Sequence, residues 1–218
     1  MRDHDREEPP LTSGRQLAYD HLKDAVLSDP AMQGRFINEQ ELADDIGVSR
    51  TPIREALLLL AAEELVQLVP KRGAYIAPVV GREIRELFEL RGMIECYAAR
   101  RTLELGSTPV AAMRAELDEQ RAMPADADAR AFIDLDHRFH TALVHAVGNE
   151  LLDKSYDALR ARQVRAGIAA LFSAGNRRRA VLDEHDAIVA ALDAGDAAAA
   201  EAAITAHLDA TQHVLLAG

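Results

Sequence analysis

Four residues in the C-terminal half of the chain have the types and spacing of a metal site. Asp136 and His140 are four residues apart in DLDHRFHTAL, so on a helix they lie about 40° apart on one face. His185 and His207 each interrupt an apolar stripe of a later predicted helix, where a buried titratable group needs a partner. One carboxylate with three imidazoles suits a divalent ion such as Zn²⁺, Ni²⁺ or Mn²⁺, and it leaves one or two positions for water or a ligand.

Each of these histidines could instead be a hydrogen-bonded residue of an apolar core, and only the four together favour a metal ion. The other histidines fit the set less well. His4 lies near the N-terminus, while His137, His145 and His213 fall off the apolar stripes and are predicted on the helix surface. The basic run 177–179 is predicted to be surface charge at the start of a helix. A carboxylate is the natural ligand to complete the coordination sphere, since oxygen anions suit such ions.

A second group of residues suits contact with nucleic acid. Residues 39–77 read as a helix, a tight turn, a second helix and a small β-hairpin with the cationic tip PKRG. Ser49 stands where the N-cap of the second helix belongs. Arg50, Thr51 and Arg54 then share a side of that helix close to its N-terminus, which is the end that a recognition helix presents to the major groove.

The charge of the chain is acidic overall, yet some of its cations are concentrated. The 218 residues carry a net charge of −11. Residues 1–78 hold nine Lys/Arg and fourteen Asp/Glu, and residues 79–218 hold sixteen and twenty-two. Between Ser49 and Gly73, however, four cations stand against three acids. We therefore expect DNA binding through a local basic surface, with a clear salt dependence.

The composition is that of an ordinary globular protein of the cytoplasm. Apolar residues make up 49% of the chain and charged residues 28%. A single cysteine, Cys96, excludes an internal disulfide and fits a reducing compartment. The sequence shows no signal peptide and no apolar run long enough to cross a bilayer, so we expect a cytoplasmic protein that does not associate with membranes.

The expected fold is mainly α, with an N-terminal winged helix-turn-helix that includes a small β-hairpin, followed by an antiparallel all-α helical bundle. We expect a flexible tail over 1–12, a DNA-binding domain over 13–78, a linker over 79–81 and the bundle over 82–218. Helices of the bundle are expected at 82–105, 108–123, 126–147, 150–172, 177–194 and 196–216. Glycine or proline marks each break that we predict between these helices.

The segments GVSRTPIREAL and LVPKRGAYIAP resemble the winged helix-turn-helix of the GntR family of bacterial transcription regulators, in its FadR-like branch. The resemblance implies a homodimer that binds an inverted repeat of double-stranded DNA. It also implies base contacts from Arg50, Arg54 and Gln40. The other expected DNA contacts, to the backbone or from the wing near the minor groove, are Arg35, Ser49, Thr51, Lys71, Arg72 and Gly73.

Regulators of this branch carry a C-terminal helical ligand-binding domain, often called FCD, in which many members bind a metal ion through an Asp and three His. The predicted metal set matches that pattern residue by residue, with Zn²⁺ as the first expectation. The resemblance further implies a small organic-acid or sugar-acid effector, and Arg91 matches an arginine that can face the effector cavity in relatives. Arg91 could equally pair with Glu95, which lies four residues further along the same helix.

The expected function is a metabolite-responsive DNA-binding transcription regulator, most simply a repressor that releases DNA when the effector binds. Such a response needs a coupling of only about 1–3 kcal/mol. A competing hypothesis is a helical metalloenzyme that uses the Asp/His₃ site, but only Asp134 stands near the ligands as a general acid or base, so we expect no enzyme. The remaining hypotheses are a regulator with a purely structural metal and a metal-free regulator with an acyl-CoA-type effector. The full Asp/His₃ set argues against the metal-free regulator.

Overall fold

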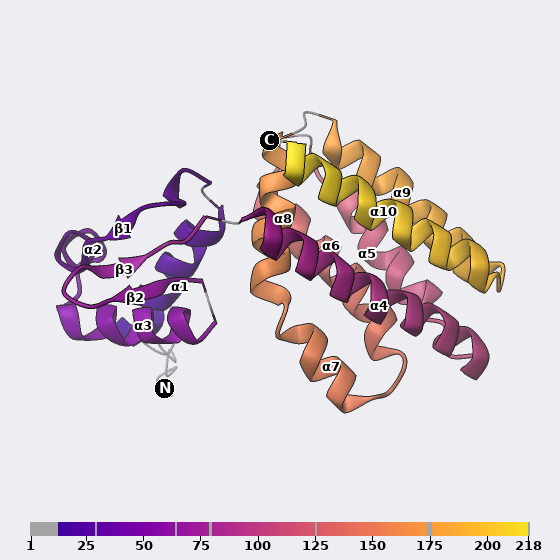
Figure 1. Ribbon diagram of the computed structural model, residues 1–218, viewed down its shortest axis with the longest axis horizontal. Helices are drawn as coiled ribbons and strands as arrows, with labels where there is room; N and C mark the ends of the chain where they lie inside the picture. The colour runs from indigo at the N-terminus through magenta and orange to yellow at the C-terminus, as the bar shows by residue number, and fades with distance from the viewer. Residues whose placement is uncertain are drawn as a thin grey trace, which may run out of the picture. The chain divides into compact units, whose positions relative to one another are not determined.

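The computed structural model describes residues 13–28, 30–63, 65–78, 80–124, 126–173 and 176–217 (Figure 1). Within these ranges the chain is mainly helical with one small antiparallel sheet, which confirms the expected fold class. The chain divides into two compact units, one built mainly from residues up to 77 and the other mainly from residue 78 onward. The tail expected over 1–12 and residue 79 of the expected linker lie outside the described residues.

The first unit consists of short helices and a three-stranded sheet (Figure 1). Its elements are α1 (Gly14–Ser28), the 3₁₀ turn η1 (Pro30–Met32), β1 (Phe36–Ile37), α2 (Glu39–Ile46), α3 (Arg50–Ala62), β2 (Gln67–Val69) and β3 (Gly73–Tyr75). The expected hairpin is β2 and β3, and β1 is a further strand that the sequence did not predict. Strand β3 lies in the middle and pairs antiparallel with both neighbours, so that Ile37 and Leu68 flank Ala74.

The helix-turn-helix has the tight turn that its sequence indicated, together with a cap at Asn38 that was not predicted. The side chain of Asn38 caps α2 by accepting hydrogen bonds from backbone N–H groups of the first turn. Gly47 ends α2 with a φ of 76°, a left-handed conformation that glycine adopts readily and that makes the tight corner before α3. Ser49 occupies the N-cap position of α3 without making a side-chain capping bond. Helix α3 is held in place by its inner face, where Ile53 and Leu57 are buried.

The hairpin that forms the wing depends on Gly73. This residue has a φ of 91°, and a Cβ atom added there would lie 2.9 Å from the backbone oxygen of Ile37 in the neighbouring strand. Both the backbone conformation and the close approach of β1 therefore require glycine. The glycine that sequence analysis placed at the DNA surface thus has a structural role in the sheet as well.

The second unit is a bundle of α-helices (Figure 1). Its elements are α4 (Gly81–Leu105), α5 (Val110–Ala122), α6 (Ala129–His145), α7 (Glu150–Asp157), α8 (Arg160–Ser173), α9 (Arg177–Asp193) and α10 (Ala197–Ala217). The single helix expected over 150–172 is wrong, because the chain breaks at 158–159 into α7 and α8. None of the described helices combines the length and the apolar character that a membrane crossing requires.

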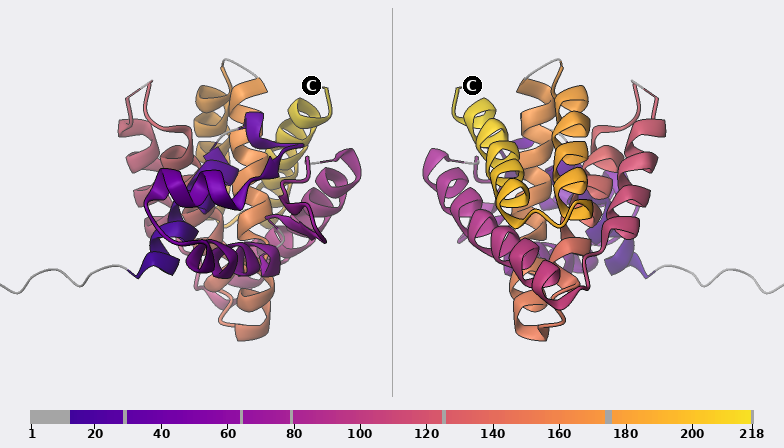
Figure 2. Two further views of the ribbon diagram at one scale, coloured as in Figure 1. Left: turned by 90° about the vertical axis from the view of Figure 1, so that its left-hand side faces the viewer. Right: turned by 90° about the vertical axis from the view of Figure 1, so that its right-hand side faces the viewer.

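The helices of the bundle lie alongside one another (Figure 2). Their buried side chains form one apolar core. Helix α10 packs against α4 and α9, α5 packs against α6 and α9, and α8 packs against α6. The approach of α8 to α6 is close at Gly167, where a Cβ atom would lie 2.8 Å from the side chain of Ile133. This arrangement places α6, α9 and α10 around a common interior, where the polar residues of the predicted metal site meet.

Candidate metal centre and nucleic-acid interface

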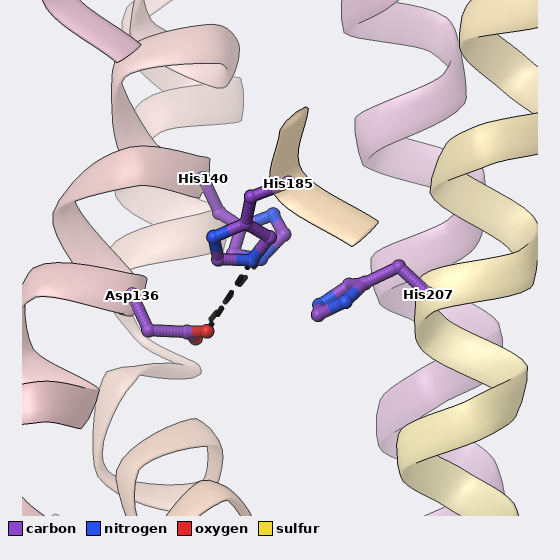
Figure 3. A group of neighbouring side chains, drawn as sticks. All are labelled: Asp136, His140, His185 and His207. Carbon is purple, nitrogen blue, oxygen red and sulfur yellow. Dashed lines mark ion pairs between the residues drawn. The ribbon is translucent and has the colours of Figure 1, made fainter. Parts of the chain in front are cut away.

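The four predicted metal ligands converge inside the second unit (Figure 3). Asp136 and His140 come from α6, His185 comes from α9 and His207 comes from α10. One possible ligand atom of each side chain lies within 4.8 Å of those of the other three. Oδ1 of Asp136 is 3.4 Å from Nε2 of His185, and its Oδ2 is 4.0 Å from Nε2 of His140. Three buried histidines and one half-buried carboxylate therefore share one small volume.

Two of the histidines have a carboxylate behind them, on the side away from the centre. Oε2 of Glu95 lies 2.8 Å from Nδ1 of His140. Oε2 of Glu184 lies 2.7 Å from Nδ1 of His207 and forms a hydrogen bond with it. Because an ionised carboxylate only accepts hydrogen bonds, each Nδ1 must carry the proton. Nε2 of both rings is thus left as a lone-pair donor, which is the form that binds a metal ion.

The third histidine has an amide in the same role. Nδ1 of His185 lies 3.2 Å from Oε1 of Gln120. The amide nitrogen of Gln120 donates to the backbone oxygen of Phe132 at 3.1 Å, which turns the amide oxygen toward His185. His185 is therefore also held with Nε2 facing the centre. Among the described residues, neither this atom nor Nε2 of His140 has a hydrogen-bond partner, although both are buried.

The surroundings favour neutral imidazoles. Burial lowers the pKa of His185 well below its ordinary value, and the neighbouring histidines lower it further. Burial also lowers the pKa of His207, against the opposing effect of the hydrogen bond that its Nδ1 donates to Glu184. The ring of His185 stacks on Phe139 with 4.0 Å between centroids, which fixes its plane. These histidines need lose no proton at neutral pH before they can bind a metal ion.

The four side chains fit a divalent ion. In a tetrahedral site with metal–ligand bonds of about 2.1 Å, two ligand atoms are about 3.4 Å apart. The possible ligand atoms span up to 4.8 Å, so the side chains would have to draw together by about 1 Å around an ion. Buried Nε2 atoms without a partner are costly in an apolar interior, and a cation among them would satisfy them together with the carboxylate.

Arg91, the predicted effector contact, has a partner within its own helix. Its Nε donates to Oε1 of Glu95 at 2.8 Å, and both side chains are buried. The hydroxyl of Tyr156 donates to the same oxygen at 2.7 Å. Burial alone would raise the pKa of Glu95, but Arg91 and His140 outweigh it, so that the pKa is well below its ordinary value. Arg91 therefore holds the carboxylate that stands behind the predicted ligand His140, and it also lines a small neighbouring cavity.

Arg177 was predicted as surface charge, and this prediction is wrong. Its side chain is buried and donates to both carboxylate oxygens of Glu184, at 2.6 and 2.8 Å. A further bond joins it to the hydroxyl of Thr211 at 2.5 Å. The arginine at the start of α9 is thus held inward by a carboxylate on the same face of the helix, two turns further along. Sequence reasoning missed Glu184, although its spacing from Arg177 was visible.

His137 was predicted on the helix surface, and this prediction is also wrong. Its side chain is buried, and Nδ1 lies 2.8 Å from Oε1 of Gln163 on α8. Helix α6 is covered on two sides, by the bundle core and by α8, so a residue off the main apolar stripe is buried as well. Gln163, which sequence analysis did not single out, thereby becomes a buried polar residue beside the site. His145 and His213 are exposed, as expected.

A small cavity of about 20 Å³ adjoins the predicted ligands. Its polar lining consists of Arg91, Asp136, Gln163, Arg177, His207 and Thr211. Two buried donors in this lining have no hydrogen-bond partner among the described residues, the amide nitrogen of Gln163 and Nε of Arg177. The volume suffices for about one water molecule, and the lining is rich in donors that suit an anionic or hydroxylated guest.

The predicted DNA contacts surround a separate groove in the first unit. It has a volume of about 700 Å³ and lies between the start of α3 and the wing. Six of the nine predicted contacts line it: Gln40, Arg50, Arg54, Lys71, Arg72 and Gly73. The other three, Arg35, Ser49 and Thr51, are exposed but are not part of its lining. The guanidinium of Arg72 lies 4.1 Å from the ring centroid of Phe36, which supports the wing against β1.

One acid in this groove was not predicted to take part. Oε2 of Glu39, at the start of α2, accepts from Nη2 of Arg50 at 3.0 Å and from Nε of Arg54 at 2.8 Å. The arginine side chains remain 52% and 60% exposed, whereas that of Glu39 is only 19% exposed, so the acid lies beneath the two cations. Burial alone would raise the pKa of Glu39, but the two arginines outweigh it and the pKa is lowered.

A winged helix-turn-helix with cations at its recognition helix and wing, joined to a helical unit with a buried polar site, defines a DNA-binding transcription regulator. Residues 15–76 match the family described as "Bacterial regulatory proteins, gntR family", and residues 86–210 match the FCD domain. The chain belongs to the GntR family and carries an FCD domain. This family consists of transcription regulators, which decides against the metalloenzyme hypothesis.

Relatives and solved structures agree with this assignment. An uncharacterised HTH-type transcriptional regulator of Streptomyces ambofaciens is 32% identical over 200 residues, which cover 91% of this chain and 83% of that protein. The HTH-type transcriptional repressor RspR of Escherichia coli strain K12 is 28% identical over 200 residues, with coverage of 91% and 87%. A GntR regulator from Rhodococcus sp. RHA1 has the same fold, with a TM-score of 0.76, 22% identity and coverage of 95% and 99%.

Proposed function

We propose that this chain is a repressor whose FCD unit senses a small carboxylate at a divalent metal ion held by Asp136, His140, His185 and His207. The observation that carries the proposal is the arrangement of the three imidazoles. Each Nδ1 faces its own acceptor, so that Nε2 of each ring is left for the ion beside the carboxylate. Three separate acceptors in the same role on three helices are hard to explain as core packing alone.

Zn²⁺ is the ion we propose, with Ni²⁺ and Mn²⁺ as the other candidates. Three imidazole nitrogens favour borderline ions over Mg²⁺ or Ca²⁺, which prefer all-oxygen surroundings. A carboxylate as the fourth ligand is compatible with each of the three candidates. A bound ion would supply a Lewis-acidic position for an oxygen ligand, and the chain's own groups would orient that ligand from the cavity side.

The charges around the cavity favour a small monoanion as the effector. Three carboxylates, Asp136, Glu95 and Glu184, stand against two guanidiniums, Arg91 and Arg177, which leaves one negative charge. A divalent ion changes that balance to one positive charge, which a single carboxylate would neutralise. The unpartnered donors of the cavity lining would bind its oxygens or those of a neighbouring hydroxyl. An organic acid or a sugar acid has this chemistry.

The proposed output is operator binding by a DNA-binding domain over 13–78, with the effector domain over 82–218. Arg50, Arg54 and Gln40 would read base edges from the recognition helix. Backbone contacts would come from Arg35, Ser49, Thr51 and Gly73, and Lys71 and Arg72 would place the wing at or near the minor groove. The name of the relative RspR supports repression as the mode of action. Effector binding would release DNA with a coupling of about 1–3 kcal/mol.

A homodimer on an inverted repeat completes the proposal. Helix α4 has an apolar stripe on its outer face, where Leu90, Met93 and Tyr97 are 37%, 60% and 41% exposed. Glu86 and Arg100 lie seven residues before and after Met93. Two antiparallel copies of α4 that cross at Met93 would bury the stripe and place each Glu86 opposite an Arg100. Sedimentation of the wild-type protein as a monomer at micromolar concentration would contradict the dimer.

Metal analysis of the purified chain tests the input side. We expect about one metal ion per chain, and its loss in the double variant Asp136→Ala/His185→Ala. His213→Ala is the matched control, because His213 is an exposed histidine of α10 and its loss should leave the metal content unchanged. Wild-type protein that stays free of metal after dialysis against each of the three ions would overturn the metal site.

A purely structural metal is the second candidate, and the cavity volume favours it, since about 20 Å³ admits no acid of several carbons. A thermal-shift screen of organic and sugar acids, with and without a chelator, separates the two candidates. If an acid raises the unfolding temperature only when the metal is bound, the ion is part of the sensor. If metal raises it and no acid adds to the effect, the ion is structural.

A further inference from the structure

We infer that Glu39 is a specificity-determining residue of the DNA-binding face, which positions two recognition arginines and rejects DNA phosphates. The inference rests on the proposed recognition role of Arg50 and Arg54. It concerns a residue that neither the resemblance nor the sequence pattern singled out. It is carried by the two hydrogen bonds to Glu39, by the different exposure of the three side chains and by their place in the groove.

The geometry of the bonds leaves the arginines ready to read a base. Arg54 uses Nε to contact Glu39, so both of its terminal Nη groups remain for another partner. Arg50 uses Nη2 and keeps Nη1 and Nε. A guanidinium presents five N–H donors in a rigid plane, and a guanine edge needs two of them. A carboxylate that occupies one donor fixes the plane and direction of the others, so the arginine need not be ordered when DNA binds.

The depth of Glu39 decides what it can contact. Its side chain is 19% exposed and lies beneath two arginines that are each more than half exposed. DNA that enters the groove would therefore meet the arginines first, and Glu39 could hold them throughout the encounter. A phosphate that approached the same arginines would sit close to the negative charge of the half-buried Glu39, and the two anions would repel each other.

These two effects act in the same direction on specificity. Attraction to phosphates supplies nearly all non-specific DNA binding, and each neutralised phosphate adds about 0.9 to the slope of log affinity against log salt. By occupying donors of two of the four cations that line the groove, Glu39 lowers this component. Base readout by pre-oriented arginines is retained. Specificity is the difference between the free energies of binding to the specific site and to other DNA. Glu39 therefore raises specificity by weakening the complex with other DNA.

Helix stability is a competing explanation for an acid at this position. Glu39 and Glu41 both lie in the first turn of α2, where a negative charge is favourable next to the helix N-terminus. Glu41 is exposed, and the ion pairs of Arg50 and Arg54 are made with Glu39 instead. Glu41 therefore offers a control with the same charge, in the same turn, without the contact to the arginines.

The experiment compares the full-length wild type with Glu39→Gln, Glu39→Asp and Glu41→Gln on two DNA duplexes. One duplex is selected from a random library by the wild-type protein, and the other is a random-sequence duplex of equal length. Affinities are measured by fluorescence anisotropy over a range of salt concentrations. Thermal unfolding by circular dichroism checks that each variant is folded.

We expect Glu39→Gln to bind the random duplex about tenfold more tightly, with a salt slope steeper by about 2 for a dimer, and to gain less on the selected duplex. Its specificity ratio should therefore fall by about tenfold. Glu39→Asp keeps the charge but is too short to reach both arginines. It should bind the random duplex as the wild type does and the selected duplex about tenfold more weakly. Glu41→Gln should keep the wild-type ratio.

An equal change of the ratio in Glu39→Gln and Glu41→Gln would overturn the inference, because any acid of the turn would then have the same effect. So would wild-type ratios in both Glu39 variants. Arg54→Ala separates this failure from failure of the recognition face itself. If Arg54→Ala leaves binding to the selected duplex unchanged, the assignment of the recognition helix is wrong, and the role of Glu39 falls with it.

Discussion

Replacement of Glu184 by glutamine tests whether the groups behind the histidines set the metal affinity. The carboxylate of Glu184 accepts three bonds, two from Arg177 at 2.6 and 2.8 Å and one from Nδ1 of His207 at 2.7 Å. An amide of the same shape has one acceptor oxygen, so its NH₂ group must face one of these donors. In either orientation of the amide, Arg177 loses its only described counter-charge, and in the orientation that turns the NH₂ group toward His207 that ring also loses its acceptor.

The loss of metal affinity and the loss of folding stability can each be estimated. Loss of a hydrogen-bonding partner behind a metal ligand weakens binding by about 10- to 100-fold, which is about 1.4–2.7 kcal/mol. Removal of one partner of a buried ion pair costs about 3–5 kcal/mol. Arg177 is buried but Glu184 is 22% exposed, and glutamine keeps one bond. We therefore expect the metal-free variant to lose about 2–3 kcal/mol in free energy of unfolding.

Competition with a chromophoric chelator gives the Zn²⁺ affinity, and urea unfolding of metal-free protein gives the stability. Asp183→Asn is the matched control, since it removes the same charge from the exposed neighbouring position of α9. If Glu184→Gln binds Zn²⁺ as tightly as Asp183→Asn, then Glu184 does not orient His207 for a metal ion. The reasoning from the Nδ1 partners would then be refuted even if a metal is present.

Three further outcomes are expected. Glu95→Ala should cost about 3–5 kcal/mol in urea unfolding, because it leaves a buried arginine unpaired, and a loss below about 1 kcal/mol would contradict the buried network. In metal-free protein, the free energy of unfolding should fall as the pH drops below about 6.5. Burial lowers the pKa of His137 and His185 in the folded state, so the unfolded chain takes up their protons first, and a flat profile down to pH 5 would disprove this. Gly73→Ala should destabilise the first unit by about 1–3 kcal/mol in thermal unfolding, since its φ is 91° and a Cβ would contact Ile37; unchanged stability would show that the wing adapts.

Local signals in the sequence predicted the first unit well. The tight turn at Gly47 and the cationic tip of the hairpin depend on residues close by in the chain, so they could be predicted without knowledge of distant contacts. The cap at Asn38 is equally local but was not predicted. Strand β1 was missed for the opposite reason. Two residues show no periodicity, and Phe36 and Ile37 form a strand only because β3 is available to pair with them.

The convergence of the four predicted ligands in the second unit was predictable because each of them lies in an apolar stripe of its own helix. The groups behind the ligands were not predicted, because they depend on which helices pack together. Arg177 is buried through its contacts with α9 and α10, and His137 is buried because α8 covers a second side of α6. The break between α7 and α8 has no glycine or proline. Tyr156, in the last turn of α7, and Leu159, at the corner itself, are both buried.

The small cavity beside the ligands has a consequence for the speed of the response. If the proposed acid binds in this cavity, the surrounding helices must part before it can enter, because the space holds only about one water molecule. Association would then be limited by the opening rate and would fall below the usual range of about 10⁵–10⁷ M⁻¹s⁻¹ for encounter-limited binding. The same opening step would also limit the rate at which the bound acid leaves. A regulator built in this way would ignore brief pulses of its effector and report the level of the acid averaged over the opening time.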